Sequence, residues 1–175
     1  CLFIEEREDH LDDDPLFTAE QEALTAKFRA AGVSVQRHYW SARFPRFLEL
    51  EQMAEDVDVF MLFNDAATHE HIDVVAEIAK DYGVLVCAAD LDSVIDGAAI
   101  GAGITWAAFA APLISQMADI VLLQNARFAQ PICIPAQENV HYNIQAMEDQ
   151  GVVLTPAARA LLKMRSIDEK DLVTY

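Results

Sequence analysis

Six side chains that could contact a small molecule stand where apolar segments of the sequence end: Glu6, Asn64, Asp65, Asp90, Thr105 and Trp106. A carboxylate in such a place can hold an ammonium or hydroxyl group of a ligand, and an amide or hydroxyl group can add a further hydrogen bond. An aromatic side chain can cover an apolar or ring portion of the same molecule. The set therefore predicts a binding site for a small organic solute.

The acidic members of this set also have a purely structural explanation. Asp65, Thr68, Asp90 and Asp92 are predicted to stand just before helices, where such side chains accept hydrogen bonds from free backbone amides. For one aspartate alone, capping and ligand contact explain the position equally well. The convergence of four such loops is what favours ligand contact.

The aspartates near residue 90 do not form a calcium loop. Asp90, Asp92 and Asp96 are followed by a glycine, but Val94 occupies the expected third ligand position and Ile95 the expected glycine position. A calcium loop needs an oxygen ligand and a sharp turn at those two places. We therefore assign no metal site here.

The sequence also lacks the motifs of a catalytic site or a phosphate loop. His69 and His71 are two residues apart, so on a helix they point to different sides and cannot form a zinc pair. Gly97, Gly101 and Gly103 follow neither phosphate-binding spacing and are expected to permit close backbone packing. No nucleophile elbow or supported Ser-His-Asp or Cys-His set occurs. We assign no catalytic residue and no cofactor.

The composition is that of a folded and strongly acidic protein, with 53% hydrophobic residues and a formal net charge of −17. Nucleic acid and anionic membrane surfaces would repel such a chain, so neither is expected as a partner. Ile104–Leu123 approaches the length of a membrane-spanning helix, but Pro112 interrupts it and Asp119 would be costly in hydrocarbon. We expect a helix that packs on protein.

Apolar segments and helical stripes alternate along the chain. Strands are predicted at 2–6, 33–40, 57–63, 84–89 and 97–104, of which 57–63 and 84–89 are apolar enough to be buried on both faces, and helices at 18–31, 47–54 and 69–82. Thr18 with Gln21 gives a capping-box spacing, and Gly32 and Gly83 fit helix ends. A further strand at 130–136 and helices at 143–150 and 156–164 are predicted. The order implies an α/β fold with a parallel β-sheet between two layers of helices, which binds ligands at the carboxyl ends of its strands.

Several segments follow, in order, the pattern of a known family: Asp58–Asp65, Val84–Val94, Gly97–Ala98, Gly103, Asn143 with Ala146, and Thr155–Ala157. The chain resembles the ABC-transporter substrate-binding family whose characterised members include tryptophan- and tyrosine-type binding proteins. The similarity covers most of the chain and is best from Val57 to about Ala110. It implies a type I periplasmic-binding-protein fold, in which two Rossmann-like (flavodoxin-like) three-layer lobes close on a ligand.

Members of that family are roughly twice this length, so the resemblance implies that the chain corresponds to the C-terminal lobe, with the N-terminal lobe missing. The resemblance implies an α/β ligand-binding lobe at 1–106, a crossover helix at 107–129 that would pack on the absent lobe, and a returning strand with C-terminal helices at 130–175. The helix Trp106–Leu123 would then expose an apolar face and favour self-association.

The resemblance implies a solute-binding component of an ABC importer that captures an amino acid or related compound and docks on a membrane permease. It implies a location in the periplasm or tethered outside the membrane. The family's Asp-Asn-Thr loop is here Asn64-Asp65-Ala66-Ala67, and Thr105 replaces an expected aspartate. These changes speak against an aromatic amino acid as the ligand. A sensing domain of a signalling protein and a flavodoxin-like nucleotide or flavin enzyme are the alternatives.

Overall fold

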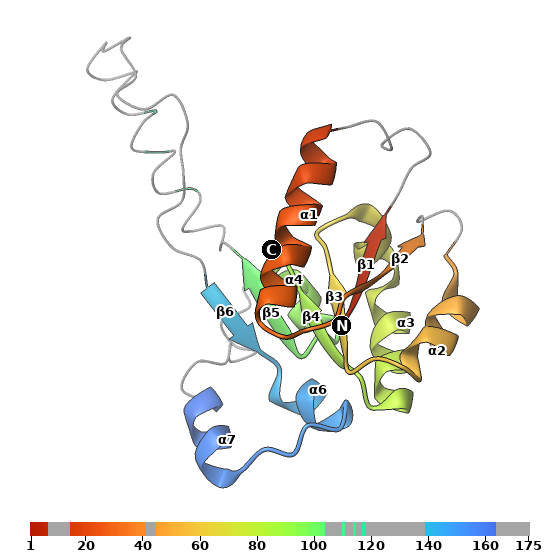
Figure 1. The fold of residues 1–175 in the computed structure, drawn as a ribbon. Coiled ribbons are helices and arrows are strands. Elements are labelled where there is room, and N and C mark those ends of the chain that lie inside the picture. The colour runs from red at the N-terminus through yellow and green to blue at the C-terminus, as the bar shows by residue number, and fades with distance from the viewer. Residues whose placement is uncertain are drawn as a thin grey trace.

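The computed structural model describes residues 1–6, 15–40, 45–103 and 139–163, together with Ala110, Ile114 and Met117. Strands and helices alternate as far as β5 (Figure 1). The strands are β1 (Leu2–Glu6), β2 (Gln36–Trp40), β3 (Val59–Leu62), β4 (Leu85–Ala88), β5 (Ile100–Gly103) and β6 (Asn139–Tyr142). The helices are α1 (Pro15–Ala30), α2 (Phe47–Ala54), α3 (Ala66–Tyr82), α4 (Asp92–Ile95), α6 (Ile144–Asp149) and α7 (Pro156–Lys163).

One six-stranded sheet runs through the molecule in the order β2-β1-β3-β4-β5-β6. The strands from β2 to β5 are parallel, which confirms the predicted α/β class. The parallel sheet carries one antiparallel strand at its edge, because β6, which lies outside the strand–helix–strand units, pairs antiparallel with β5, with Gly103 opposite Asn139. The chain moves from β1 outward to β2 and then returns to β3 on the other side of β1. The strand order therefore reverses between β1 and β3, where open α/β sheets form their ligand crevice.

The sheet separates two layers because successive side chains of a strand point to opposite faces. On one face the strands pack against α2 and α3 in the main core, which includes the fully buried Leu62, Phe60 and Val75. On the other face the ring of Phe3 makes edge-to-face contacts with Phe28 of α1 and Phe63, at centroid distances of 5.2 and 5.4 Å. The three-layer arrangement is thus observed around β1 and β3.

A second, smaller cluster attaches the C-terminal elements to the sheet. Ala99, Ala146 and Met147 are buried there. Partly buried side chains from β4, β5, β6 and α7 pack around them: Leu85, Ile100, Tyr142, Val152, Leu154 and Leu162. This cluster packs the C-terminal elements against β4 and β5, and Figure 1 shows α6 and α7 at the bottom of the molecule, below β6.

Two helices begin three residues earlier than the apolar pattern predicts. α1 starts at Pro15 rather than Thr18, and proline suits a first helical turn because its missing N–H has no partner there in any case. α3 starts at Ala66 rather than His69 because Asp65 Oδ1 accepts a hydrogen bond from the backbone N–H of Thr68 at 2.7 Å. Gly83 ends α3 with a φ of 69°, as predicted.

Several predictions concern residues outside those that the structure describes. The strand predicted at 130–136 lies there, and so does most of the helix predicted at Trp106–Leu123. β6 was not predicted, whereas the helices at 143–150 and 156–164 correspond to α6 and α7. Within the described ranges, no helix combines the length and the apolar character needed to cross a bilayer.

Candidate functional site

The loops after β3 and β4 carry three of the candidate ligand residues at neighbouring strand ends. β3 and β4 are in parallel register, with Leu62 beside Ala88, and the N–H of Ala89 donates to Leu62 O at 3.0 Å. Asn64, Asp65 and Asp90 follow directly. Both loops therefore open on the carboxyl edge of the sheet, and β3 borders the point where the strand order reverses.

In the loop after β3, the side chains are engaged locally. Asp65 caps α3 through Thr68, while the exposed Asn64 places Oδ1 at 2.8 Å from Nε2 of His69. The Thr68 side chain is fully buried, and its Oγ1 has no hydrogen-bond partner in the part of the chain that the structure describes. The predicted capping role of Asp65 is confirmed, but Thr68 lies inside the helix rather than before it.

The loop after β4 is more tightly closed. Asp90 is only 9% exposed, and its Oδ1 accepts from the backbone N–H of Ser93 at 2.7 Å. Its Oδ2 accepts from the Ser93 hydroxyl at 2.8 Å. Capping by Asp90 is therefore confirmed, whereas Asp92 is the first residue of α4 and not its cap. Each carboxylate oxygen has a second lone pair with which it can accept from a ligand.

β5 passes directly beneath this loop, which explains one of its glycines. A Cβ on Gly101 would lie 2.3 Å from Cγ2 of Val94 and 2.4 Å from the carbonyl oxygen of Asp90. Only glycine permits this approach of the strand to the loop, as the sequence predicted for the glycine-rich segment. Close packing against β5 thus restricts the backbone of the Asp90 loop.

Two amide side chains from the C-terminal segment bond to the backbone of the segments that flank the Asp90 loop. Asn143 Nδ2 donates to Val94 O at 3.0 Å while its Oδ1 caps α6. Gln150 Nε2 donates to Gly97 O at 3.0 Å, and its Oε1 accepts from the buried N–H of Val86 at 2.9 Å. The segments that flank the Asp90 loop are therefore held in place, and such preorganisation lowers the entropic cost of binding a ligand.

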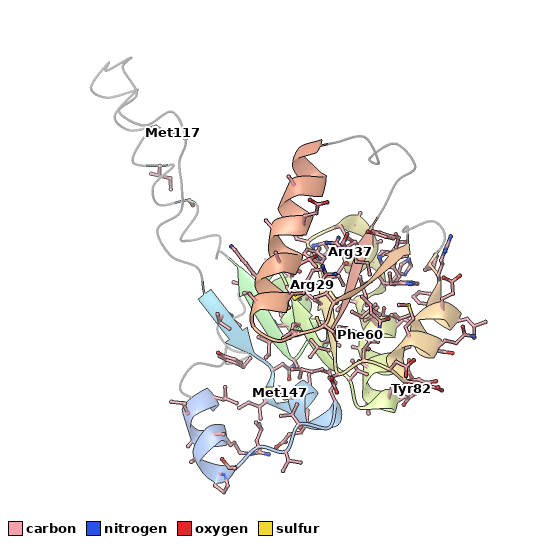
Figure 2. All side chains as sticks on the ribbon, in the orientation of Figure 1. Arg29, Arg37, Phe60, Tyr82, Met117 and Met147 are labelled. Atoms are coloured by element: carbon pink, nitrogen blue, oxygen red, sulfur yellow. The ribbon has the colours of Figure 1, made fainter. Side chains whose placement is uncertain are left out.

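A buried ion pair at the end of β1 was not predicted. Glu5 is 3% exposed, and the Arg37 guanidinium donates to its two oxygens at 2.8 and 3.1 Å and to Thr25 Oγ1 at 2.7 Å. Arg37, which Figure 2 labels, also lies over the ring of Phe3, 5.5 Å from its centroid. The group ties β2 and α1 to β1, and a buried charge of this kind is tolerated because it is paired. The clue in the sequence is that each charged residue lies two positions from an apolar residue, so the two side chains share one face of the strand.

The remaining candidates are only partly placed by the structure. Glu6 is the last residue of β1 and lies in register with Trp40, at the carboxyl edge. Thr105 and Trp106 lie outside the described residues. The geometry therefore brings together Asn64, Asp65 and Asp90 on adjacent loops.

Few features of the described side chains indicate a nucleophile or a metal site. Burial raises the pKa of the Cys87 thiol to about 11, so this cysteine is a protonated and poorly nucleophilic thiol near neutral pH. Burial lowers the pKa of His141. Across residues 1–6, 15–40, 45–103 and 139–163, no group of three or more His, Cys, Asp or Glu side chains is arranged to hold a metal ion.

Comparison with solved structures identifies the fold. A ligand-free, open substrate-binding protein with adhesive properties from Clostridium difficile aligns with 89% of this chain at 17% identity and a TM-score of 0.63. A conserved domain protein from Vibrio cholerae aligns with 94% at 15% identity and a TM-score of 0.67. The ABC domain in complex with L-Trp from Streptococcus pneumonia aligns with 94% at 12% identity and a TM-score of 0.66.

The chain has the fold of substrate-binding proteins, and it spans about half the length of these structures, from 50% to 55% of each. At these identities the likeness establishes the fold alone. No family model and no curated protein matches the sequence.

Proposed function

We propose that this chain is the ligand-binding lobe of a two-lobe solute receptor that serves an ABC importer. The observation that carries the proposal is a pair of adjacent loops, after β3 and β4, in each of which an aspartate accepts a backbone hydrogen bond from the following helix. Both loops lie beside the reversal of strand order. The fold supports it, since the similar structures include substrate-binding proteins, and the length supports a second lobe, since the chain spans half of each. The receptor would act outside the cytoplasmic membrane and deliver its solute to a permease.

The site is suited to a small solute with hydrogen-bond donors, such as an amino acid or a related amine. Asp65 and Asp90 would accept hydrogen bonds from the donors of such a solute, and Asn64 would add an amide at the exposed rim. Glu6 and Thr105 would contribute further polar contacts, and Trp106 a stacking surface. The Asp90 loop, against which Gly101 packs closely, would serve as the fixed wall against which the second lobe closes.

Two exposed apolar side chains outside the site indicate a surface that a further part of the protein would cover. Ile114 and Met117 are 64% and 55% exposed, and both belong to the segment Trp106–Leu123 for which the sequence predicts an apolar helix. We propose that a second lobe, or a second copy of the chain, covers this surface.

Thermal unfolding against a panel of amino acids, small amines, carboxylates and sugars tests the proposed function. A ligand at one hundred times its dissociation constant should stabilise the protein by about 2.7 kcal/mol. Asn64→Ala removes a rim contact without removing a helix cap, so we expect it to diminish the ligand-induced shift and to leave the unliganded midpoint nearly unchanged. Asp81→Asn, on an exposed residue of α3, is the matched control and should retain the full shift.

The panel is applied to this chain and to a longer form that carries a second lobe. A shift in the longer form alone supports closure of two lobes on the solute. A nucleotide or flavin bound to the purified protein, with no shift from any solute, would contradict the receptor proposal and support the flavodoxin-like enzyme instead.

A further inference from the structure

A cluster of four rings closes the edge of the sheet at β2. Trp40 lies at its centre, with centroid distances of 6.4 Å to His38, 6.1 Å to Phe47 and 5.9 Å to His71. Phe47 and His71 complete the group at 5.3 Å. The four side chains come from β2, α2 and α3, so the cluster attaches the N-terminal end of α2 to the lobe, beside the attachment of Leu50 and Ala54 in the main core. We refer to these residues as the edge cluster.

His38 is the unusual member of the edge cluster because it is a buried titratable group without hydrogen-bond compensation. It is 4% exposed, and its Nε2 has no partner among the residues that the structure describes. A neutral ring leaves one unsatisfied atom there, but a protonated ring must donate from both nitrogens. Protonation would therefore place an uncompensated charge inside the cluster, and this is avoided only if the ring becomes exposed to water.

The charged groups that face His38 do not compensate for burial. On α2, Glu49 favours the protonated ring and Arg46 opposes it. These two side chains pair with each other at 3.3 Å and are mostly exposed, so their influence is screened by solvent. On α3 the titratable neighbour of the cluster is His71, and on β1 the residue in register is the apolar Ile4. Burial dominates and lowers the pKa of His38.

The attachments of β2 and α2 differ in strength. β2 is paired over five residues with β1 and is also held by the Arg37 bonds to Glu5 and Thr25. α2 is a helix of 8 residues without a side-chain cap at its N-terminus, and its buried residues are Leu50 and Ala54. A helix this short depends on packing for its stability. The weaker attachment is therefore that of α2.

We propose that His38 is an acid-sensitive latch, whose protonation releases α2 from the edge cluster while the sheet stays formed. Opening of a short element at the periphery is the type of local transition that precedes global unfolding in many proteins.

The direction of the pH effect follows from the lowered pKa. In the released state the ring has the ordinary histidine pKa of about 6.5, and in the closed state the pKa is lower. The released state therefore binds the proton more tightly. The stability of the closed state is complete above about pH 6.5 and decreases as the pH falls from there through the pKa of the buried ring.

Fluorescence of Trp40 in the full chain tests the latch. The sequence has two tryptophans, so Trp106→Phe leaves Trp40 as the single emitter. Between pH 7.5 and 4.5 we expect its emission maximum to move to longer wavelength with a midpoint below 6.5, while far-ultraviolet circular dichroism retains most of its amplitude. His38→Gln in the same background should abolish the transition. His69→Gln, on an exposed histidine of α3, removes the same charge and should preserve it.

A transition that persists in His38→Gln would overturn the proposal, as would a Trp40 emission that does not change while His38 becomes protonated. The second measurement is the titration of the His38 ring by NMR in the unsubstituted chain, which requires no variant to fold. A midpoint below 6.5 that coincides with the Trp40 transition supports the latch. A midpoint at or above 6.5 overturns it, because the closed state would then carry the charged ring without opening.

Discussion

The main core and the second cluster are two regions of one sheet that are stabilised in different ways. The main core consists of large apolar side chains from β1 to β4, α2 and α3, several of them fully buried. The second cluster has three buried apolar side chains, two of which are alanines. There the amide groups of Asn143 and Gln150 bond to the backbone and complete the attachment. Apolar burial thus stabilises one region, and a few specific hydrogen bonds fix the other.

The difference also separates stability from positioning. The main core holds the strands in register, whereas the amide bonds of the second cluster end on β4, on α4 and on the turn after α4, which flank the loop that carries Asp90. Substitutions in the first region should therefore lower the free energy of unfolding most, and substitutions in the second should mainly change the loop.

The largest effect is expected from deleting a ring in the main core. Phe60 is 0% exposed, and Phe60→Ala should lower the free energy of unfolding by about 4 kcal/mol through lost burial and the cavity that remains. In the second cluster Met147→Ala should cost less, about 2 kcal/mol, because the side chain is 7% exposed and belongs to a small cluster. Urea unfolding measures both. Leu48→Ala, at an exposed position of α2, is the control and should change little.

An intermediate effect is expected from Gln150. Gln150→Ala leaves the N–H of Val86 and the carbonyl of Gly97 without their partner, and should cost about 2 kcal/mol in urea unfolding. Gln145→Ala, on the exposed side of α6, removes only a local bond to Asp149 and should cost little. Equal costs for the two glutamines would remove the distinction between the regions, because the amide bonds would then contribute nothing specific.

The smallest effects are expected from the two capping aspartates. Asp65→Ala should cost about 1 kcal/mol by uncapping α3, which packs on the main core. Asp90→Ala should cost somewhat more, since it also leaves the hydroxyl of the fully buried Ser93 without its acceptor. Thermal unfolding of both variants gives the order. If Asp65→Ala lowers the unfolding midpoint more than Asp90→Ala does, the Asp90 loop is less tightly held than its contacts imply.

Most of the fold could be predicted because the buried strands of a parallel sheet are nearly continuous apolar runs. β1 and α2 were predicted to the residue, and β3 and β4 to within two residues at each end. β6 was missed because Asn139–Tyr142 alternates polar and apolar residues over only four positions at the sheet edge. The start of α3 was misplaced because its first turn contains Ala66 and Ala67, whose small side chains give no clear stripe.

The site was predictable only as far as strand ends can be located. Asn64, Asp65 and Asp90 could be found because each follows an apolar run, and the structure places them on adjacent loops. The bonds of Gln150 to Val86 and Gly97, and those of Arg37 to Glu5, join residues that are 32 to 64 positions apart. Such pairs depend on strand register and helix placement, which a pattern of residue types does not specify.

The antiparallel pairing of β6 has a consequence for how this scaffold can diversify. Gly103 and Asn139 are directly opposite each other, so the chain leaves and re-enters the sheet at one place, on the same edge as the Asp90 loop. The cost of closing such an excursion rises only slowly with its length. Segments of other lengths and compositions can therefore be exchanged between these two residues while the strand order stays intact. Changes in the segment between Gly103 and Asn139 can therefore alter recognition without altering the strands of the sheet.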